Sequence, residues 1–215
     1  MPLIQEKDKE QIRKIFSDKM KNPVTVINFT QEFECDYCRQ TRQLTEELAS
    51  LSDKITTKSY DFMRDHAQAD ELGVDKIPAT VIIGERDYHV KYYGIPSGYE
   101  FMSLIDDIID ASQHASRLSE PIKQKLKAIN KPVHIQVFIT PTCPYCPKAV
   151  RTAHQFAMEN QFIKADMIEA TEFPDLSNKY SVMAVPKIVI NENVEFEGAM
   201  PEQIFLSKVE EALAS

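Results

Sequence analysis

The four cysteines of this chain form two Cys-x-x-Cys motifs that occupy matching places in its two halves. The first motif runs from Cys35 to Cys38 and the second from Cys143 to Cys146, so each position recurs at an offset of 108 (143 minus 35). A proline preceded by a β-branched residue follows each motif at one and the same spacing, in the pairs Ile77-Pro78 and Val185-Pro186. Three landmarks that repeat at one offset indicate two copies of one structural unit.

The repeat divides the 215 residues into two domains of about 100 residues, a common domain size. We expect a first unit at residues 1–117 and a second unit at 118–215, with the linker between 112 and 121, where Ser, Gln, Glu and Pro gather. Hydrophobic residues make up 43% of the chain and charged residues 27%, an ordinary globular composition.

Hydrophobic periodicity predicts the same order of elements in both units. Each unit begins with a helix and a strand, continues through the motif into a second helix, and then has a strand, a short helix, a hairpin and a last helix. The expected strands lie at 24–29, 55–61, 79–84, 88–93, 133–139, 163–167, 187–190 and 194–196. Strands that alternate with helices before a hairpin predict an α/β fold with a mixed sheet and helices on both faces.

Two cysteines separated by two residues suit thiol–disulfide exchange, because a ring of this size closes across one helical turn. A thiolate attacks a disulfide, and a second thiol resolves the mixed disulfide. Free N–H groups at a helix N-terminus stabilise the thiolate of a cysteine placed there. We therefore predict Cys35 and Cys143 as attacking thiols and Cys38 and Cys146 as resolving thiols. Pro144 is expected in the first turn of the helix that follows.

The surroundings of the two motifs differ in charge. Cys35 stands between Glu34 and Asp36, which disfavour a neighbouring thiolate, although two arginines on the following turns oppose this in part. Cys143 stands between uncharged residues, with Lys148 nearby. We predict a lower pKa for the Cys143 thiol and a more oxidising second site.

A strand, a Cys-x-x-Cys at a helix start and an apolar–Pro pair before a hairpin together resemble the thioredoxin fold. Two such units in tandem resemble the protein disulfide oxidoreductases of archaea and thermophilic bacteria, also called glutaredoxin-like proteins. The segments 137–146 and 182–187 are especially similar to that family. The resemblance covers essentially the whole chain and implies two tandem thioredoxin-like domains, each with a mixed central sheet flanked by helices.

The resemblance also implies roles for residues outside the cysteines. Pro78 and Pro186 would be cis prolines packed against the dithiols. Ile77 and Val185, which precede them, would offer main-chain groups to an extended substrate. Tyr37 and Tyr145 recur at the repeat offset and are either substrate contacts or exposed loop aromatics.

The family activity implied is oxidation, reduction and isomerisation of disulfides in protein substrates, without a cofactor beyond the dithiols. Electrons would come from a flavoprotein of the thioredoxin-reductase type. The chain departs from the related patterns in two respects. Phe29 and Val137 stand where thioredoxins have a buried aspartate, and a single glycine, Gly198, stands where glutaredoxins have a double-glycine turn for glutathione.

Other functions share parts of this pattern. An electron donor to a peroxidase or a reductase would carry the same motifs and differ only in its substrate. A holdase or metal-storage module would bind zinc, but zinc ribbons separate their cysteine pairs by about 15–20 residues, whereas a far longer segment separates Cys38 from Cys143. Structural disulfides are a weaker alternative, because a two-residue loop constrains little chain.

The net charge of −8 offers no basic surface for nucleic acid, and the five glycines form no phosphate-binding loop. The N-terminus lacks the apolar core of a secretory signal, and no apolar run approaches the length of a membrane-spanning helix. We therefore expect no membrane association and a cytoplasmic location. In such a compartment cysteines serve catalysis, redox sensing or metal binding more often than structural disulfides.

Overall fold

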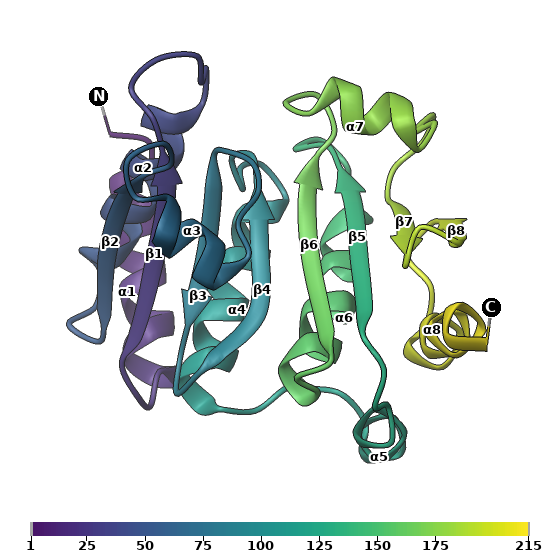
Figure 1. Ribbon diagram of the computed structural model, residues 1–215. Coiled ribbons are helices and arrows are strands. Elements are labelled where there is room, and N and C mark those ends of the chain that lie inside the picture. Colours follow the sequence, from purple (N-terminus) through teal and green to yellow (C-terminus); the bar gives the residue numbers. More distant parts are fainter. Residues whose placement is uncertain (1, 215) are drawn as a thin grey trace.

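The structure of the protein is a computed structural model, of which residues 2–214 are described. Its strands form one eight-stranded sheet in the order β2-β1-β3-β4-β6-β5-β7-β8 (Figure 1). The strands are β1 (Val24–Thr30), β2 (Ile55–Asp61), β3 (Ala79–Ile83), β4 (Asp87–Tyr93), β5 (Val133–Ile139), β6 (Ile163–Glu169), β7 (Lys187–Ile190) and β8 (Val194–Glu197). The helices are α1 (Glu6–Lys19), α2 (Cys38–Ala49), α3 (His66–Leu72), α4 (Glu100–Gln113), α5 (Glu120–Lys127), α6 (Cys146–Glu159), α7 (Pro174–Lys179) and α8 (Glu202–Ala214).

The sheet consists of two equivalent groups of four strands, which confirms the repeat. In the first group β1 pairs with β2 in parallel and with β3 antiparallel, and β3 pairs with β4 antiparallel. Strands β5 to β8 repeat these pairings, with β6 in the place of β2. All eight strands lie where the sequence predicts them, and the α/β fold class is confirmed.

The two groups join edge to edge, which the sequence does not predict. Strand β4 pairs in parallel with β6, from Val90 opposite Ala165 to Tyr93 opposite Ile168. An edge strand carries a row of unpaired N–H and C=O groups, and this pairing satisfies both edges at once. The two units therefore share one continuous sheet in place of two separate ones.

Hydrophobic side chains cover both faces of the sheet. Helices α1, α2, α4, α5, α6 and α8 contribute to the larger apolar core on one face. Helices α3 and α7 and the segments next to them cover the other face. Adjacent residues on a strand point to opposite faces, so Val26 belongs to the first core and Ile27 to the second. Residues of both units mix in each core.

Strand direction places both Cys-x-x-Cys motifs at one edge of the sheet. Strands β1, β2, β4, β6 and β5 all run the same way, because each pair along this path is either parallel or related through the antiparallel β3. The motif loops follow the carboxyl ends of β1 and β5. Four strand spacings separate β1 from β5, which corresponds to roughly 19 Å.

The helix after each motif begins later than the sequence predicts. Helices α2 and α6 begin at the second cysteine, Cys38 or Cys146, after an N-cap tyrosine. Pro144 therefore precedes α6, and the expectation that it occupies the first turn is wrong. Pro147 occupies the first turn instead. Its missing N–H is not needed there, because the first N–H groups of a helix have no intrahelical acceptor.

Residues 114–119 form the segment between α4 and α5. It is bound at several points to helices of both units. The Ser116 hydroxyl donates to Glu159 on α6 at 2.5 Å, and Arg117 pairs with Asp106 and Asp110 on α4. Among residues 2–214, no helix has the length and apolar character needed to cross a membrane.

Candidate active sites

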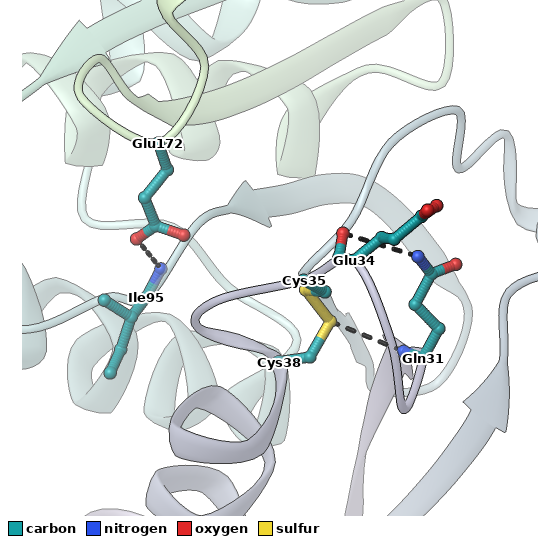
Figure 2. The surroundings of a disulfide bond; sticks show 6 residues. All are labelled: Gln31, Glu34, Cys35, Cys38, Ile95 and Glu172. Carbon is teal, nitrogen blue, oxygen red and sulfur yellow. Dashed lines mark hydrogen bonds between the residues drawn. A yellow bond between two sulfur atoms is a disulfide. The ribbon is translucent and has the colours of Figure 1, made fainter.

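The first site is the disulfide between Cys35 and Cys38 in the loop after β1 (Figure 2). Cys35 is half-buried, whereas Cys38 is only 1% exposed. The backbone N–H of Gln31 lies 3.4 Å from the Cys38 sulfur, and the Gln31 amide donates to the Glu34 carbonyl at 3.4 Å. Solvent therefore reaches the first cysteine more easily than the second.

The second site is the disulfide between Cys143 and Cys146 in the loop after β5. Cys143 is 7% exposed and Cys146 is fully buried. The backbone N–H of Cys146, the first residue of α6, donates to the Cys143 sulfur at 3.1 Å. This contact directs an otherwise unpaired helix N–H at the sulfur atom, an arrangement that stabilises a thiolate after reduction.

The two predicted prolines have the same backbone conformation. The Ile77–Pro78 and Val185–Pro186 peptide bonds are both cis, as the resemblance implied. At the second site the carbonyl oxygen of Val185 lies 3.7 Å from the Cys143 sulfur. The predicted main-chain substrate contact is thus next to the predicted attacking thiol.

Each cis proline is also bonded to the loop after the hairpin. The N–H of Gly94 donates to the Pro78 carbonyl at 2.9 Å, and the N–H of Gly198 donates to the Pro186 carbonyl at 2.8 Å. The two sites thus share a frame of motif loop, cis-proline loop and glycine loop. Substrate contacts by Ile77, Val185 and the two prolines remain predictions.

Each motif carries one exposed tyrosine, and an exposed methionine precedes the second cis proline. Tyr37 and Tyr145 are the N-cap residues of α2 and α6 and are 45% and 70% exposed. Met183, which sequence reasoning missed, is 89% exposed and lies two residues before Val185. The sequence signal that could have identified Met183 is a large apolar residue in the loop that precedes Pro186.

A cleft of about 740 Å³ opens beside the first disulfide. It lies between α2 and the carboxyl end of β2. Its lining includes both cysteines, three arginines and three carboxylates, in the set Thr30, Gln31, Glu32, Cys35, Cys38, Arg39, Arg42, Ser59, Tyr60, Asp61, Arg64 and Asp65. Charges of both signs therefore border the first site.

The positions where thioredoxins have a buried aspartate are apolar here. Phe29 and Val137 are both fully buried. Beside Phe29, the Asn28 amide donates to Thr45 at 2.7 Å and accepts a hydrogen bond from the Thr80 hydroxyl at 3.2 Å. The buried polar group next to Phe29 is thus a neutral hydrogen-bonded amide.

Two buried acids, Glu169 and Glu100, and the half-buried Glu172 occur elsewhere at the same edge of the sheet, and sequence reasoning missed them. Glu169 ends β6 and is 1% exposed, and Glu172 follows it in the next loop. Burial raises the pKa of Glu172 to about 7, although the bond from the Ile95 N–H opposes this effect. Glu100, the first residue of α4, is fully buried, and burial raises its pKa to about 7 as well.

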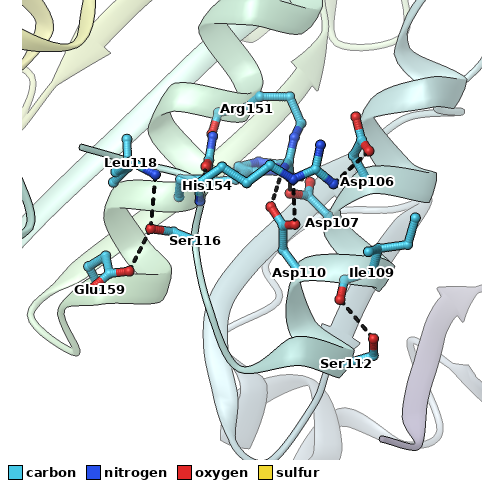
Figure 3. A network of polar contacts seen from close by, with 12 residues as sticks. Asp106, Asp107, Ile109, Asp110, Ser112, Ser116, Leu118, Arg151, His154 and Glu159 are labelled. Atoms are coloured by element: carbon cyan, nitrogen blue, oxygen red, sulfur yellow. Dashed lines mark hydrogen bonds and ion pairs between the residues drawn. The ribbon is translucent and has the colours of Figure 1, made fainter. Parts of the chain in front are cut away.

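A buried polar network joins α4 of the first unit to α6 of the second (Figure 3). Arg151 on α6 forms ion pairs with Asp107 and Asp110 on α4. His154 Nδ1 lies 2.6 Å from an oxygen of Asp107, to which Tyr92 also donates. Burial lowers the pKa of His154 to about 3, so the ring is neutral at pH 7. The network lies between the units and not at either disulfide.

Within residues 2–214, no three His, Cys, Asp or Glu side chains are grouped so that they could hold a metal ion. The cysteine pairs follow β1 and β5, which are separated by three strands.

Comparison with known proteins identifies relatives for the whole chain. A family model described as a thioredoxin domain matches residues 133–211. The crystal structure of a protein disulfide oxidoreductase from Aeropyrum pernix is 34% identical, superposes with a TM-score of 0.91, and covers 97% of this chain and 93% of its own. A structure of alkylhydroperoxide reductase AhpF from Enterococcus faecalis is 25% identical with a TM-score of 0.88, covering 96% of this chain and 99% of its own.

Curated relatives are longer proteins. The alkyl hydroperoxide reductase AhpF of Pseudomonas aeruginosa is 24% identical over 94% of this chain and 36% of the relative. An NADH dehydrogenase of Bacillus subtilis is 27% identical over 82% of this chain and 32% of the relative. The chain therefore spans about a third of the length of the curated relatives it matches.

Proposed function

The chain belongs to the protein disulfide oxidoreductase family with tandem thioredoxin-fold units, and we propose that it forms, reduces or isomerises disulfides in protein substrates. Thiol–disulfide oxidoreduction itself follows from the family and from the two Cys-x-x-Cys sites. The observation that carries the protein substrate is the Val185 carbonyl, 3.7 Å from the Cys143 sulfur. A peptide that adds to this backbone would bring its own disulfide to the sulfur atom.

The reaction at the second site follows from the positions of its two sulfur atoms. In the reduced protein the Cys143 thiolate attacks one sulfur of a substrate disulfide, which releases the other as a thiolate and forms a mixed disulfide. The Cys146 thiol loses its proton and attacks the Cys143 sulfur, which releases the second substrate thiolate. Two electrons pass to the substrate, and Cys143–Cys146 becomes the disulfide. The reverse sequence oxidises a substrate dithiol.

The same scheme applies to Cys35 and Cys38 at the first site. Burial supports the division of roles, because Cys38 and Cys146 are 1% and 0% exposed and a bulky substrate cannot reach them. The half-buried Cys35 and the less deeply buried Cys143 would attack. Tyr37, Tyr145 and the exposed Met183 would contact apolar side chains of the substrate.

A second candidate function is electron donation to a peroxidase or a reductase. The resemblance to alkyl hydroperoxide reductase AhpF, in both structure and sequence, favours it. In this function a flavoprotein of the thioredoxin-reductase type would reduce one dithiol, and the same dithiol would then reduce a disulfide of the peroxidase or the reductase.

Separate reduction potentials for the two dithiols distinguish these functions. The oxidised protein is equilibrated with glutathione buffers, alkylated, digested and mapped by mass spectrometry. A Cys143–Cys146 potential near about −180 mV, like that of a disulfide isomerase, supports formation and reshuffling of protein disulfides. Potentials near about −270 mV at both sites, like that of thioredoxin, favour electron donation. A protein without activity on any protein disulfide would contradict the main proposal.

A further inference from the structure

The glycine loops beside the two cis prolines have different surroundings. A Cβ atom at Gly94 would lie 2.6 Å from the Glu169 Cβ and 3.0 Å from a carboxyl oxygen of Glu172, whereas one at Gly198 would meet nothing within 4 Å. Both glycines have positive φ and donate to a cis proline in the same way. The second unit thus covers the glycine loop of the first, and its own glycine loop is open.

Glu172 makes a direct bond to this loop. The N–H of Ile95 donates to Glu172 Oε1 at 2.7 Å, next to the Gly94 N–H that donates to the Pro78 carbonyl at 2.9 Å. Figure 2 shows Ile95 and Glu172 in the surroundings of the first disulfide. Two successive N–H groups therefore connect the cis-proline loop of the first unit to an acid of the second.

The Glu172 side chain is itself held in place by its neighbour. The buried Glu169 carboxylate accepts the Glu172 N–H at 2.7 Å and the Thr171 hydroxyl at 2.6 Å, which fixes the turn after β6. Glu172 Oε2 is buried without a hydrogen-bond partner among the described residues. The bond from the Ile95 N–H is therefore the hydrogen bond that holds the Glu172 carboxylate among the described residues.

A cleft of about 410 Å³ lies along this acid, between residues of the two units. One side is Lys76, the residue before Ile77, and the other is the segment from Glu172 into α7. The second unit therefore lies close to the chain segment that leads to Ile77.

We propose that Glu172, supplied by the second unit, is a positioning residue for the first Cys-x-x-Cys site. Its carboxyl oxygen holds the Ile95 N–H and so fixes the loop that supports Pro78, the edge on which a peptide substrate of Cys35 is placed. The inference rests on the proposed function, since it concerns peptide binding at that site. The second site has no equivalent, because Gly198 is open.

The test uses the full chain with one site active at a time. Cys143→Ser/Cys146→Ser leaves the first site, and Cys35→Ser/Cys38→Ser leaves the second. In each background Glu172→Ala and Glu172→Gln are compared with Glu197→Ala, an exposed glutamate next to Gly198. The kcat and KM are measured with a synthetic peptide that contains one disulfide, and with a small aromatic disulfide that needs no main-chain contact.

We expect Glu172→Ala to raise the KM of the first site for the peptide about tenfold, which corresponds to about 1.4 kcal/mol, with kcat and the small-disulfide rate changed less than twofold. Glu172→Gln keeps an oxygen acceptor for the Ile95 N–H and should restore the KM to within about twofold. Glu197→Ala should change neither site, and no Glu172 variant should change the second.

Three results would overturn the inference. The first is an unchanged peptide KM in Glu172→Ala. The second is an equal loss at both sites or with both substrates, which would indicate a general structural role. The third is a Gln variant as impaired as Ala. If the first site with an unchanged Glu172 reduces the small disulfide but not the peptide, both the proposed protein substrate at that site and this inference are overturned. If that site reduces both substrates, a negative result with the Glu172 variants contradicts only the role of Glu172.

Discussion

The backbone N–H of Tyr99 donates to the carbonyl oxygen of Pro141 at 3.0 Å, which joins the loop after β4 to the loop that carries Cys143. Tyr99 belongs to the first unit, and Pro141 lies two residues before the second motif. The first residue of the segment 94–99 therefore contacts the cis-proline loop of the first site. The last residue of the segment contacts the motif loop of the second site. Each site is built in part by the other unit.

This contact predicts that one methyl group added at Gly98 strongly lowers the free energy of unfolding. A Cβ at Gly98, where φ is +61°, would lie 2.2 Å from the Pro141 carbonyl oxygen, a backbone atom that cannot move aside easily. Gly73 has almost the same φ, +62°, and its nearest neighbour would be 4.0 Å away. We expect Gly73→Ala to lower the free energy of unfolding by about 1 kcal/mol and Gly98→Ala by about 3 kcal/mol. Urea unfolding measures both, and equal losses would contradict the contact.

The two attacking thiols should differ in reactivity. The helix N–H at the Cys143 sulfur and the absence of adjacent charges favour its thiolate, whereas Glu34 and Asp36 oppose the thiolate of Cys35. We expect reduced Cys143 to be alkylated faster than reduced Cys35 at pH 6 to 7. Peptide mapping after timed treatment with iodoacetamide measures both rates in one sample. Because Cys35 is also the more exposed thiol, the result that contradicts this prediction is an alkylation profile of Cys35 whose midpoint lies at a lower pH than that of Cys143.

Buried Glu100 should make stability depend on pH. Its pKa is about 7 in the folded protein against 4.5 in the unfolded chain, because burial disfavours the carboxylate more than Ser103 and Arg151 favour it. The folded state therefore binds more protons between these values, and stability falls as pH rises from about 4.5 through 7. Glu100→Gln should match the parent at pH 4.5 and exceed it at pH 8 by at most about 3 kcal/mol. Urea unfolding at both pH values tests this, and a difference that does not change with pH would refute it.

The ion network between the units should be costly to break from one side. Arg151→Met leaves Asp107 and Asp110 buried with one partner fewer, so we expect a loss of about 3–5 kcal/mol in the free energy of unfolding. Lys208→Met, on an exposed pair with Glu211, is the control and should change stability by less than about 1 kcal/mol. A small effect of Arg151→Met would mean that water or a shifted pKa compensates the aspartates.

The local sequence pattern was sufficient to predict the helices and strands and to identify the four cysteines as two motifs. Periodicity predicted all eight strands, because strands such as β5, with the sequence VHIQVFI, are rich in β-branched and aromatic residues whatever lies beside them. The sequence pattern did not determine the residue at which α6 begins. Either Pro144 or Pro147 can occupy a first helical turn, and only the path of the motif loop places Pro147 there.

Contacts between the units were beyond the reach of sequence pattern. Glu172 corresponds to Arg64 at the repeat offset, so nothing in the repeat marked it as an acid beside a site. Met183 likewise corresponds to Asp75 when the two units are aligned. Residues of this kind acquire their role from neighbours that are distant along the chain.

The sequence by itself determined the repeat, the α/β fold and the chemistry of the two dithiols, because each depends on spacing between residues of one unit. Tertiary structure decided that β4 pairs with β6, that both sites share one sheet edge, and that Glu172 holds the Ile95 N–H of the other unit. Those features depend on which edge strands of the two units pair with each other. They also depend on which acidic side chains that pairing brings against the other unit. Local propensity carries no information about either.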